Sequence, residues 1–264
     1  MMIGKVYFVG AGPGDPKLIT VRGMELLQKA EVVLYDRLVN PKLLDYVSQE
    51  ALLIDCGKEK DNHLIPQENI NQLLLRFAKN GKQVVRLKGG DPSVFGRVGE
   101  EAEECAEHEI PFEIVPGVTS GIGASIYAGI PLTHRDYASS VTFVTGHRRG
   151  DQHTQELNWD HLAKGVDTVV FYMGMHNLPY IQEQLITNGR DARTPVALIR
   201  YGTLDKQEVL TGELWNIAQE AAKASFKAPA IIVIGEVVRL RDKLKWWQGE
   251  ASISTKKVEF FLHK

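Results

Sequence analysis

Two glycine-rich segments of this sequence follow short apolar runs and end in the same tripeptide, Gly-Asp-Pro. The run Val6–Val9 leads into Gly10–Pro16, and the run Val84–Leu87 leads into Lys88–Pro92. Glycine lets a backbone approach a ligand closely because it has no Cβ. If the apolar runs are parallel strands, both segments open at the carboxyl edge of the sheet, where open α/β folds bind small molecules. The second segment continues to Arg97, so the sequence predicts one small-molecule site with two walls and a cation at its edge.

The first segment invites comparison with the glycine pattern that binds dinucleotides, but it departs from that pattern. Asp15 stands where the third glycine is needed, and Pro13 interrupts the run. A carboxylate there would repel a pyrophosphate at a helix N-terminus. Asp36, after the second apolar run, only partly matches the ribose-binding carboxylate of the dinucleotide-binding fold. Carboxylates beside exposed backbone suit a cationic, hydroxyl-bearing ligand without phosphate, and S-adenosylmethionine is such a ligand.

The elements that position these loops are expected to alternate between strand and helix through the first half of the chain. Short buried strands are predicted at Val6–Val9, Val32–Tyr35, Leu52–Asp55, Val84–Leu87 and Phe112–Val115. Helical spacing marks Val21–Lys29, Pro41–Val47, Glu68–Lys79, Gly99–Glu107 and Ser120–Ala128. In the third of these helices, Ile70, Leu73, Leu74 and Phe77 share one face, and Gly81 ends it. The alternation predicts a mostly parallel sheet with helices on both faces.

A polar stretch headed by Pro131 separates this half from a second one. There, strands are predicted at Val141–Thr145, Thr168–Tyr172, Val196–Arg200, Gln207–Thr211 and Ala230–Ile234. Helices are expected at Trp159–Ala163, Asn177–Thr187 and Leu214–Lys223. The last strands follow one another closely, which favours a mixed sheet. We therefore predict two α/β domains, residues 1–134 and 135–248, and a polar tail at 249–264 that is either disordered or a loosely attached strand.

Composition limits the class of protein. The chain has 264 residues, of which 44% are hydrophobic and 24% charged, as in soluble globular proteins. A formal net charge of −2 argues against a broadly basic nucleic-acid surface. The two cysteines, Cys56 and Cys105, are too few for a disulfide framework or a zinc site. With no signal peptide or membrane-spanning run, we expect a cytoplasmic protein that binds neither nucleic acid nor membrane and needs no metal.

Taken in order, these motifs resemble those of the S-adenosylmethionine-dependent uroporphyrinogen-III C-methyltransferases, which are tetrapyrrole methylases. In the first half, the matching segments are Gly10–Pro16, Tyr35–Leu38, Gly57-Lys58, Pro66–Glu68 with Ile70-Asn71, and Val85–Arg97. The match continues through Val115–Ser120, Gly129–Tyr137, Val144–His147, Phe171–Gly174 and Arg239–Leu244. The resemblance extends over about residues 3–248. The loop Lys88–Arg97, together with Pro131–Tyr137, is the part most specific to the uroporphyrinogen-III enzymes.

The resemblance implies a fold of two α/β domains of the tetrapyrrole methylase type, with the cofactor in the cleft between them, and a homodimer. It implies two methylations, at C2 and C7 of uroporphyrinogen III, with S-adenosylmethionine as methyl donor and S-adenosylhomocysteine as product. The first methylation gives precorrin-1 and the second gives precorrin-2, on the way to siroheme or cobalamin. A single activity is expected, because the sequence leaves no room for the dehydrogenase–ferrochelatase module fused to some relatives.

Carried over position by position, the resemblance also assigns site residues. The cofactor contacts fall on Pro13, Gly89, Gly90, Asp91, Val94, Thr119, Ser120, Met173, Gly202, Pro229 and Ala230. The proton acceptor falls on Asp36 and the proton donor on Lys58. A carboxylate at Asp36 could take a proton from the methylated ring or stabilise its positive charge, although a strand-end aspartate also commonly caps a turn. Glu59 stands where the family commonly has another basic residue, and this departure bears most on Lys58.

The substrate that the resemblance implies carries eight carboxylates, so its pocket should present cations, preferably arginines. The candidates are Arg37, Arg97, His134 and Arg135, of which Arg97 and Arg135 lie in the strongest motifs. Three other functions stay open at this point. One is a later methylase of the cobalamin pathway that acts on another precorrin, and the second is a nucleotide-dependent dehydrogenase. The third is a regulator that binds cofactor or tetrapyrrole without releasing a methylated product.

Overall fold

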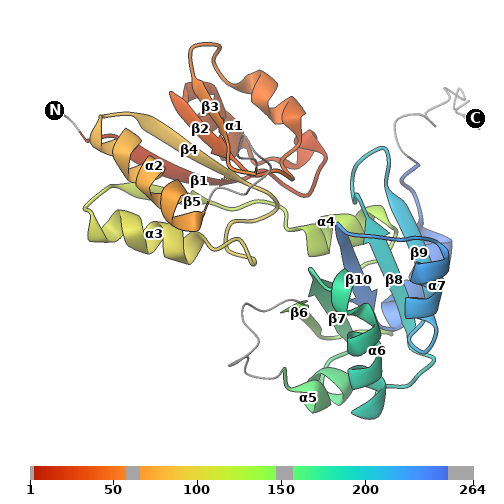
Figure 1. The fold of residues 1–264 in the computed structure, drawn as a ribbon. Helices are drawn as coiled ribbons and strands as arrows, with labels where there is room; N and C mark the ends of the chain where they lie inside the picture. Colours follow the sequence, from red (N-terminus) through yellow and green to blue (C-terminus); the bar gives the residue numbers. More distant parts are fainter. Residues whose placement is uncertain (1–2, 58–65, 147–156, 249–264) are drawn as a thin grey trace, which may run out of the picture.

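The computed structural model of this protein describes residues 3–57, 66–146 and 157–248, which form two α/β halves lying side by side (Figure 1). Lys58, Glu59 and the tail 249–264 lie outside the described residues. None of the helices within the described ranges has the length and hydropathy of a membrane-spanning segment. Across the same ranges, no group of three or more His, Cys, Asp or Glu side chains is placed to hold a metal ion.

The first half is built on a five-stranded parallel sheet, as predicted. Its strands are β1 (Lys5–Gly10), β2 (Val32–Tyr35), β3 (Leu52–Asp55), β4 (Gln83–Lys88) and β5 (Phe112–Val115), in the spatial order β3-β2-β4-β1-β5. Every pair of neighbouring strands is parallel. One face packs on α1 (Val21–Lys29) and a short 3-10 helix, Pro41–Tyr46. The other face packs on α2 (Gln67–Lys79) and α3 (Val98–Glu107).

The neighbouring strands β1 and β4 form a switch point in this sheet. The chain leaves β1 for α1 on one face and leaves β4 for α3 on the other. Open α/β sheets bind ligands at the carboxyl ends of such strands, because the diverging connections leave a crevice there. Both glycine-rich segments begin at this point, and β1 runs from the N-terminal end of the molecule toward the second half (Figure 1).

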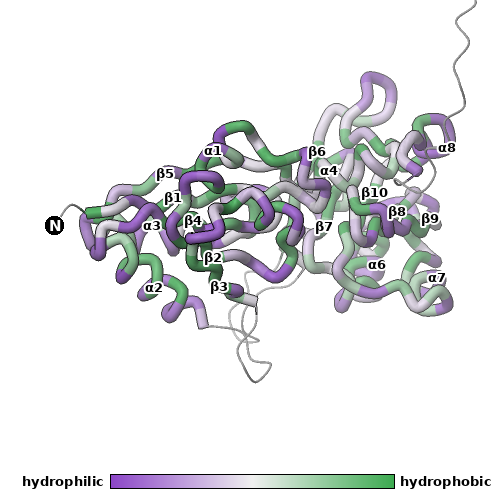
Figure 2. Tube along the Cα trace, turned by 90° about the horizontal axis from the view of Figure 1, so that it is seen from above, coloured by the Kyte–Doolittle hydropathy of each residue, from purple (hydrophilic) through white to green (hydrophobic). Residues whose placement is uncertain are grey.

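The helix α2 is amphipathic as its spacing predicts. Ile70 and Leu74 are buried, Leu73 and Phe77 are partly buried, and Gly81 ends the helix with a φ of +81°. Figure 2 shows hydrophobic and hydrophilic stretches alternating along its turns.

Two local predictions for the first half are wrong. The edge strands β3 and β5 are not buried, since Leu52, Leu53 and Ile114 are exposed where the helices cover only the middle of the sheet. The helix expected at Pro41–Val47 is a 3-10 helix rather than an α-helix.

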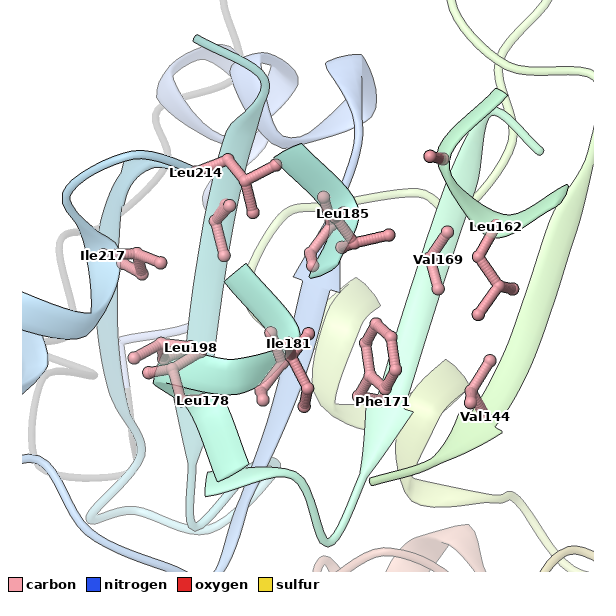
Figure 3. Close-up of a cluster of buried hydrophobic side chains, with 14 of the residues drawn as sticks. Val144, Leu162, Val169, Phe171, Leu178, Ile181, Leu185, Leu198, Leu214 and Ile217 are labelled. Carbon is pink, nitrogen blue, oxygen red and sulfur yellow. The ribbon is translucent and has the colours of Figure 1, made fainter. Parts of the chain in front are cut away.

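The second half has a mixed five-stranded sheet, which confirms the prediction. Its strands are β6 (Val141–Thr145), β7 (Thr168–Tyr172), β8 (Pro195–Arg200), β9 (Glu208–Glu213) and β10 (Ala230–Ile234), in the order β6-β7-β10-β8-β9. Only β6 and β7 pair in parallel; the other three pairs are antiparallel. The helices α5 (Trp159–Lys164), α6 (Leu178–Thr187) and α7 (Ile217–Lys223) cover one face, and Figure 3 shows the hydrophobic core beneath them.

The helix α4 (Ser120–Tyr127) connects the halves. Although it follows the last strand of the first sheet, its Ala124 packs with Val170, Ile199 and Ile231 on the second sheet. A 3-10 helix at Glu236–Leu240 and the short α8 (Arg241–Leu244) complete that layer. The division into domains at residues 134 and 135 stays a prediction, and the packing shows that α4 contributes to the second core (Figure 1).

Candidate functional site

The two glycine-rich loops are hydrogen-bonded to each other at the switch point. The Gly12 N–H donates to the Gly90 carbonyl at 3.2 Å, and the Gly90 N–H donates to the Gly12 carbonyl at 2.8 Å. Both residues have positive φ, +77° and +71°, which favours glycine. A Cβ at Gly10 would stand 2.6 Å from the Gly117 Cα, so the loop after β5 joins the other two without side chains between them. The three loops therefore form one surface at the carboxyl edge.

Beside this junction, the backbone of the second loop is loosely covered at Gly89 and Gly90. A Cβ at Gly89 would meet only Leu38, at 3.8 Å, and one at Gly90 would meet nothing nearer than 3.6 Å. Gly89 therefore has one neighbouring side chain in contact on this side, and Gly90 is in ordinary contact with Thr119 and Ser120. Such a place can receive a ligand that hydrogen-bonds to backbone atoms.

The carboxylate of Asp91 holds the second loop in shape. It accepts hydrogen bonds from the Ser93 N–H at 2.7 Å, the Ser93 hydroxyl at 2.5 Å and the Gly117 N–H at 2.9 Å. Burial would raise the pKa of Asp91, but these hydrogen bonds outweigh burial and lower it. Asp91 is therefore an anion that ties the loop after β4 to the loop after β5.

Strained backbone marks the same region from both halves. Seven non-glycine residues in the described part of the chain have positive φ, and five of them lie in loops after β4, β7 and β8. They are Phe95, Arg97, Met173, Tyr201 and Thr203, with φ between +52° and +69°. Such conformations cost roughly 1–3 kcal/mol each and gather at ligand sites. The strain thus points to a site between these loops, independently of the glycine pattern.

The loop after β8 meets the first glycine loop directly. The Asp15 N–H donates to the Thr203 Oγ1 at 2.8 Å, and a Cβ at Gly14 would stand at the same distance from that oxygen. A Cβ at Gly202 would stand 2.3 Å from the Ala124 Cβ of α4, so this position requires glycine. The two halves therefore contact each other through residues that flank the proposed cofactor site.

The strand register brings the remaining predicted cofactor residues of the second half to one edge. Ala230 pairs with Arg200, so Pro229 and Ala230 lie at the carboxyl end of β8, close to Gly202. Ile232 pairs with Phe171 in antiparallel fashion, which places the start of β10 beside the carboxyl end of β7 and Met173. Met173 is 54% exposed there, so it is not the core residue that its type alone would predict. Val94 reaches the second core from the loop after β4.

Asp36 stands at the end of a buried chain of charges. Its Oδ1 accepts a hydrogen bond from Arg86 at 2.5 Å, and the Arg86 Nε donates to Glu101 at 3.2 Å. The second oxygen of Glu101 accepts from the Lys88 Nζ at 2.8 Å. The side chains of Arg86, Lys88 and Glu101 are at most 3% exposed, whereas that of Asp36 is 36% exposed. Asp36 is thus the accessible end of the network.

The electrostatics of this network follow from burial and pairing. Burial opposes the charge of Arg86, but the carboxylates of Asp36 and Glu101 outweigh it and raise the pKa of Arg86. The pKa of Lys88 is lowered, because burial and the nearby Arg86 outweigh the attraction of Glu101. Gln67 adds a further hydrogen bond to Glu101, at 2.9 Å. The network therefore fixes Asp36 through the guanidinium of Arg86, which Glu101 holds in turn.

Sequence reasoning assigned Asp36 to the site but not its network partners Arg86, Lys88 and Glu101. A usable signal was present, because Arg86 and Lys88 interrupt the apolar run of a central strand. Charged side chains are almost never fully buried unless they are paired. The partner, Glu101, sits on α3 and could not be identified from spacing alone.

The four predicted substrate cations fall into two groups. Arg37 and Arg97 are exposed at the carboxyl edge of the first sheet, after β2 and β4. Arg97 forms an ion pair with Glu100, in which its Nε donates at 2.8 Å. Arg37 packs against Gly57, since a Cβ at Gly57 would lie 2.4 Å from the Arg37 Cβ. Arg37 follows Asp36 in the chain, and Lys58 follows Gly57. The two predicted catalytic residues are therefore each adjacent in sequence to one of the two residues in this contact.

His134 and Arg135 lie in the segment that leads to β6. The hydroxyls of Ser139 and Ser140 donate to Asp167, which precedes β7, so this segment approaches the amino end of that strand. The His134 ring contacts the Tyr137 ring in a tilted arrangement, with ring centroids 4.9 Å apart. Within the described residues, no hydrogen bond or ion pair joins His134 or Arg135 to either glycine loop. Their role in substrate binding stays a prediction.

Comparison with known proteins gives a consistent family. The family model described as "Tetrapyrrole (Corrin/Porphyrin) Methylases" matches residues 5–218. A uroporphyrinogen-III C-methyltransferase of Priestia megaterium is 54% identical over 236 residues, which cover 89% of this chain and 99% of that protein. A siroheme synthase of Pseudomonas fluorescens is 53% identical over 249 residues, or 94% of this chain and 53% of that protein. The chain thus spans about half the length of the siroheme synthases that it matches.

A solved structure extends the similarity to three dimensions. The uroporphyrin-III C-methyl transferase of Thermus thermophilus, complexed with S-adenyl homocysteine, matches with a TM-score of 0.76. The two chains are 39% identical, and the match covers 90% of this chain and 100% of that one.

Proposed function

This chain belongs to the tetrapyrrole methylase family, and from that premise we propose that it is an S-adenosylmethionine-dependent C-methyltransferase of uroporphyrinogen III. The activity consists of two methyl transfers, to C2 and C7, through precorrin-1 to precorrin-2. The observation that carries the proposal is the hydrogen-bonded pair of glycine loops at the switch point, in a chain 54% identical to a relative of that name.

The residues at this edge fit S-adenosylmethionine. Gly89 offers a peptide group with little beside it, Gly90 lets a ligand approach the backbone closely, and hydroxyls at Thr119 and Ser120 can bond to polar groups of the ligand. We assign cofactor binding to these four residues and to Pro13, Asp91, Val94, Met173, Gly202, Pro229 and Ala230. When bound, S-adenosylmethionine supplies a methyl group carried on a sulfonium. The site lies between the loops after β1 and β4 and those after β7 and β8.

Asp36 is the proposed proton acceptor. Methylation of a pyrrole carbon places positive charge on the ring, and a nearby carboxylate stabilises that charge and accepts the proton that the ring then loses. Arg86 fixes one oxygen of Asp36 and leaves the side chain 36% exposed, so the group is both oriented and accessible. Lys58 is the proposed proton donor, next to Gly57 in the chain. Orientation of the two reactants supplies much of the rate in addition.

The substrate is bound through its carboxylates. Arg37 and Arg97 stand at the carboxyl edge of the first sheet and can each form bidentate contacts. His134 and Arg135 are the further candidates from the segment before β6. The ion pair of Arg97 with Glu100 holds the guanidinium in a defined position before substrate arrives.

We further propose that the enzyme is a cytoplasmic homodimer whose product enters siroheme or cobalamin synthesis. The support for the siroheme branch is the 53% identity to siroheme synthases. Because the chain spans about half of those proteins, this proposal includes only the methyl transfers.

The test is mass spectrometry of the tetrapyrrole after incubation with uroporphyrinogen III and S-adenosylmethionine. We expect a gain of two methyl groups with the native chain and a large loss of that product with Asp36→Asn. No gain of mass would refute the proposal. A product formed only from an already methylated precorrin would identify a later methylase, and binding of both ligands without a product would identify a regulator. Thermal protection by NAD instead of S-adenosylhomocysteine would identify a dehydrogenase.

A further inference from the structure

One tyrosine of the second half holds the first residues of α4. Tyr172 is the last residue of β7, and it is 7% exposed. Its hydroxyl accepts a hydrogen bond from the Gly121 N–H at 2.8 Å and lies 2.8 Å from the Thr119 Oγ1. Both contacts join the second sheet to the chain that has just left the first one.

The contact between Tyr172 and α4 requires glycine at position 121. A Cβ at Gly121 would stand 2.3 Å from the Tyr172 hydroxyl oxygen, so only glycine permits this approach. The tyrosine ring also packs against Phe95, with centroids 5.0 Å apart. Phe95 belongs to the loop after β4, which carries Gly89 and Gly90. A single side chain thus touches both parts of the chain that the proposed cofactor site uses.

The hydroxyl of Tyr172 has three polar partners, which are the Gly121 N–H and the hydroxyls of Thr119 and Ser120. Burial raises the pKa of Tyr172, so its hydroxyl keeps its one proton. That oxygen accepts from Gly121, and it can either accept the Thr119 proton or donate its own proton to the Thr119 Oγ1. When Tyr172 donates, the proton of Thr119 is directed elsewhere and can be donated to a ligand.

We propose that Tyr172 is a positioning residue of the cofactor site, which turns the Thr119 hydroxyl into a hydrogen-bond donor for S-adenosylmethionine and seats the loop after β4 through the ring of Phe95. The inference rests on the proposed cofactor. Tyr172 itself does not contact the cofactor; it acts through Thr119 and Phe95.

The test compares Tyr172→Phe with Tyr7→Phe. Tyr7 lies on β1, and its hydroxyl donates to Gln83 at 2.9 Å, so both variants lose one hydroxyl with a protein partner. We expect Tyr172→Phe to bind S-adenosylhomocysteine about tenfold more weakly by calorimetry, as for the loss of a net hydrogen bond. Tyr7→Phe should stay within about twofold of the native chain, because Tyr7 contacts none of the site loops. In turnover, Tyr172→Phe should raise the KM for S-adenosylmethionine more than it lowers kcat.

A double variant tests whether the effect passes through Thr119. Thr119→Val combined with Tyr172→Phe should bind S-adenosylhomocysteine no more weakly than the weaker single variant, because both remove the same donor. Losses that multiply would overturn the proposed route. Native-like binding by Tyr172→Phe, with only its melting temperature lowered, would overturn the positioning role itself.

A second variant covers the case in which Tyr172→Phe does not fold. Phe95 is 40% exposed, so Phe95→Leu removes the ring contact without opening the core. We expect binding of S-adenosylhomocysteine to weaken about threefold, since the contact between the two aromatic rings is lost. Unchanged binding would overturn the role of the ring. Failure of the native chain to bind S-adenosylhomocysteine would refute the cofactor proposal, whereas binding without methyl transfer would refute only the reaction.

Discussion

The two halves of this molecule form the proposed site by different physical means. The first half links four charged side chains from β4, α3 and the carboxyl end of β2, and three of them are almost completely buried. The second half contributes left-handed backbone at Met173, Tyr201 and Thr203, together with the hydroxyl of Tyr172. The first half therefore holds a carboxylate through charge, and the second holds loops through backbone conformation and neutral hydrogen bonds.

The difference follows from two tasks of the proposed site, although loops of both halves supply the cofactor contacts. A group that takes part in proton transfer needs a fixed orientation and an electrostatic environment that only neighbouring charges provide. A surface that receives a cofactor needs peptide groups and small apolar contacts in defined positions. The comparison predicts that damage to the buried network of the first half lowers stability and turnover, whereas damage to the loops of the second half lowers cofactor affinity.

The largest expected effect comes from breaking the buried network at Glu101. Glu101→Gln leaves Arg86 and Lys88 with an uncharged partner, and removing one member of a buried ion pair costs about 3–5 kcal/mol. We expect a loss of that size in the free energy of unfolding, measured with urea. Glu100→Gln is the matched control, since Glu100 is adjacent, exposed and paired with Arg97. A surface pair contributes about 0–1 kcal/mol, so equal effects of the two variants would contradict the comparison.

The second effect concerns Asp36 and separates chemistry from binding. Asp36→Asn keeps the shape of the side chain and removes the charge that stabilises the ring and accepts its proton. We expect turnover to fall by about 10²–10⁴, the usual contribution of a general base. Binding of S-adenosylhomocysteine should be unchanged, because Asp36 lies outside the proposed cofactor contacts. Asp45→Asn, in the exposed 3-10 helix, is the control, and a similar loss of turnover there would remove Asp36 from the mechanism.

A smaller effect is expected in the second half, at Met173. Its φ of +53° is strained for methionine, so Met173→Gly should raise the free energy of unfolding by about 0.5–1 kcal/mol. The same change should weaken binding of S-adenosylhomocysteine, because the exposed side chain is lost from the cofactor wall. Ser225→Gly relieves a φ of +51° in an exposed position after α7, remote from the site loops. It should stabilise the chain without any change in affinity, and a loss of affinity with Ser225→Gly would contradict a local role for Met173.

How much of the fold and the site the sequence could predict depends on how far apart in the chain the interacting residues lie. Local signals predicted the strands, the parallel and mixed sheets and the meeting of the glycine loops, because periodicity and glycine act within a few residues. The pairing of Arg86 with Asp36 and Glu101 joins β4 to β2 and α3, which no local pattern encodes. The contact of Tyr172 with Gly121 spans both halves in the same way. Edge exposure at β3 and β5 also depends on where the helices end, so it could not be predicted from apolar runs.

The smallest expected effect tests whether the network stabilises the chain because it is buried, or only because its residues are charged. Glu113 on β5 pairs with Arg22 and Lys5 in the first half, but its side chain is 28% exposed and touches none of the site loops. The hydrogen bonds from Arg22 and Lys5 lower the pKa of Glu113 from 4.5 to about 2. A lowered pKa contributes stability above pH 4.5, and that contribution is lost as the pH falls toward 2.

We therefore expect the melting temperature of the native chain to fall between pH 4.5 and 2, and Glu113→Gln to flatten part of that decline. At pH 7, an exposed pair contributes at most about 1 kcal/mol, so Glu113→Gln should lower stability far less than Glu101→Gln and leave turnover unchanged. If Glu113→Gln destabilised the chain as strongly as Glu101→Gln, the charges themselves, and not their burial beneath Asp36, would distinguish the first half. The difference between the halves would then lie in the ion pairs of the first half as such, and not in a buried network that fixes the Asp36 carboxylate.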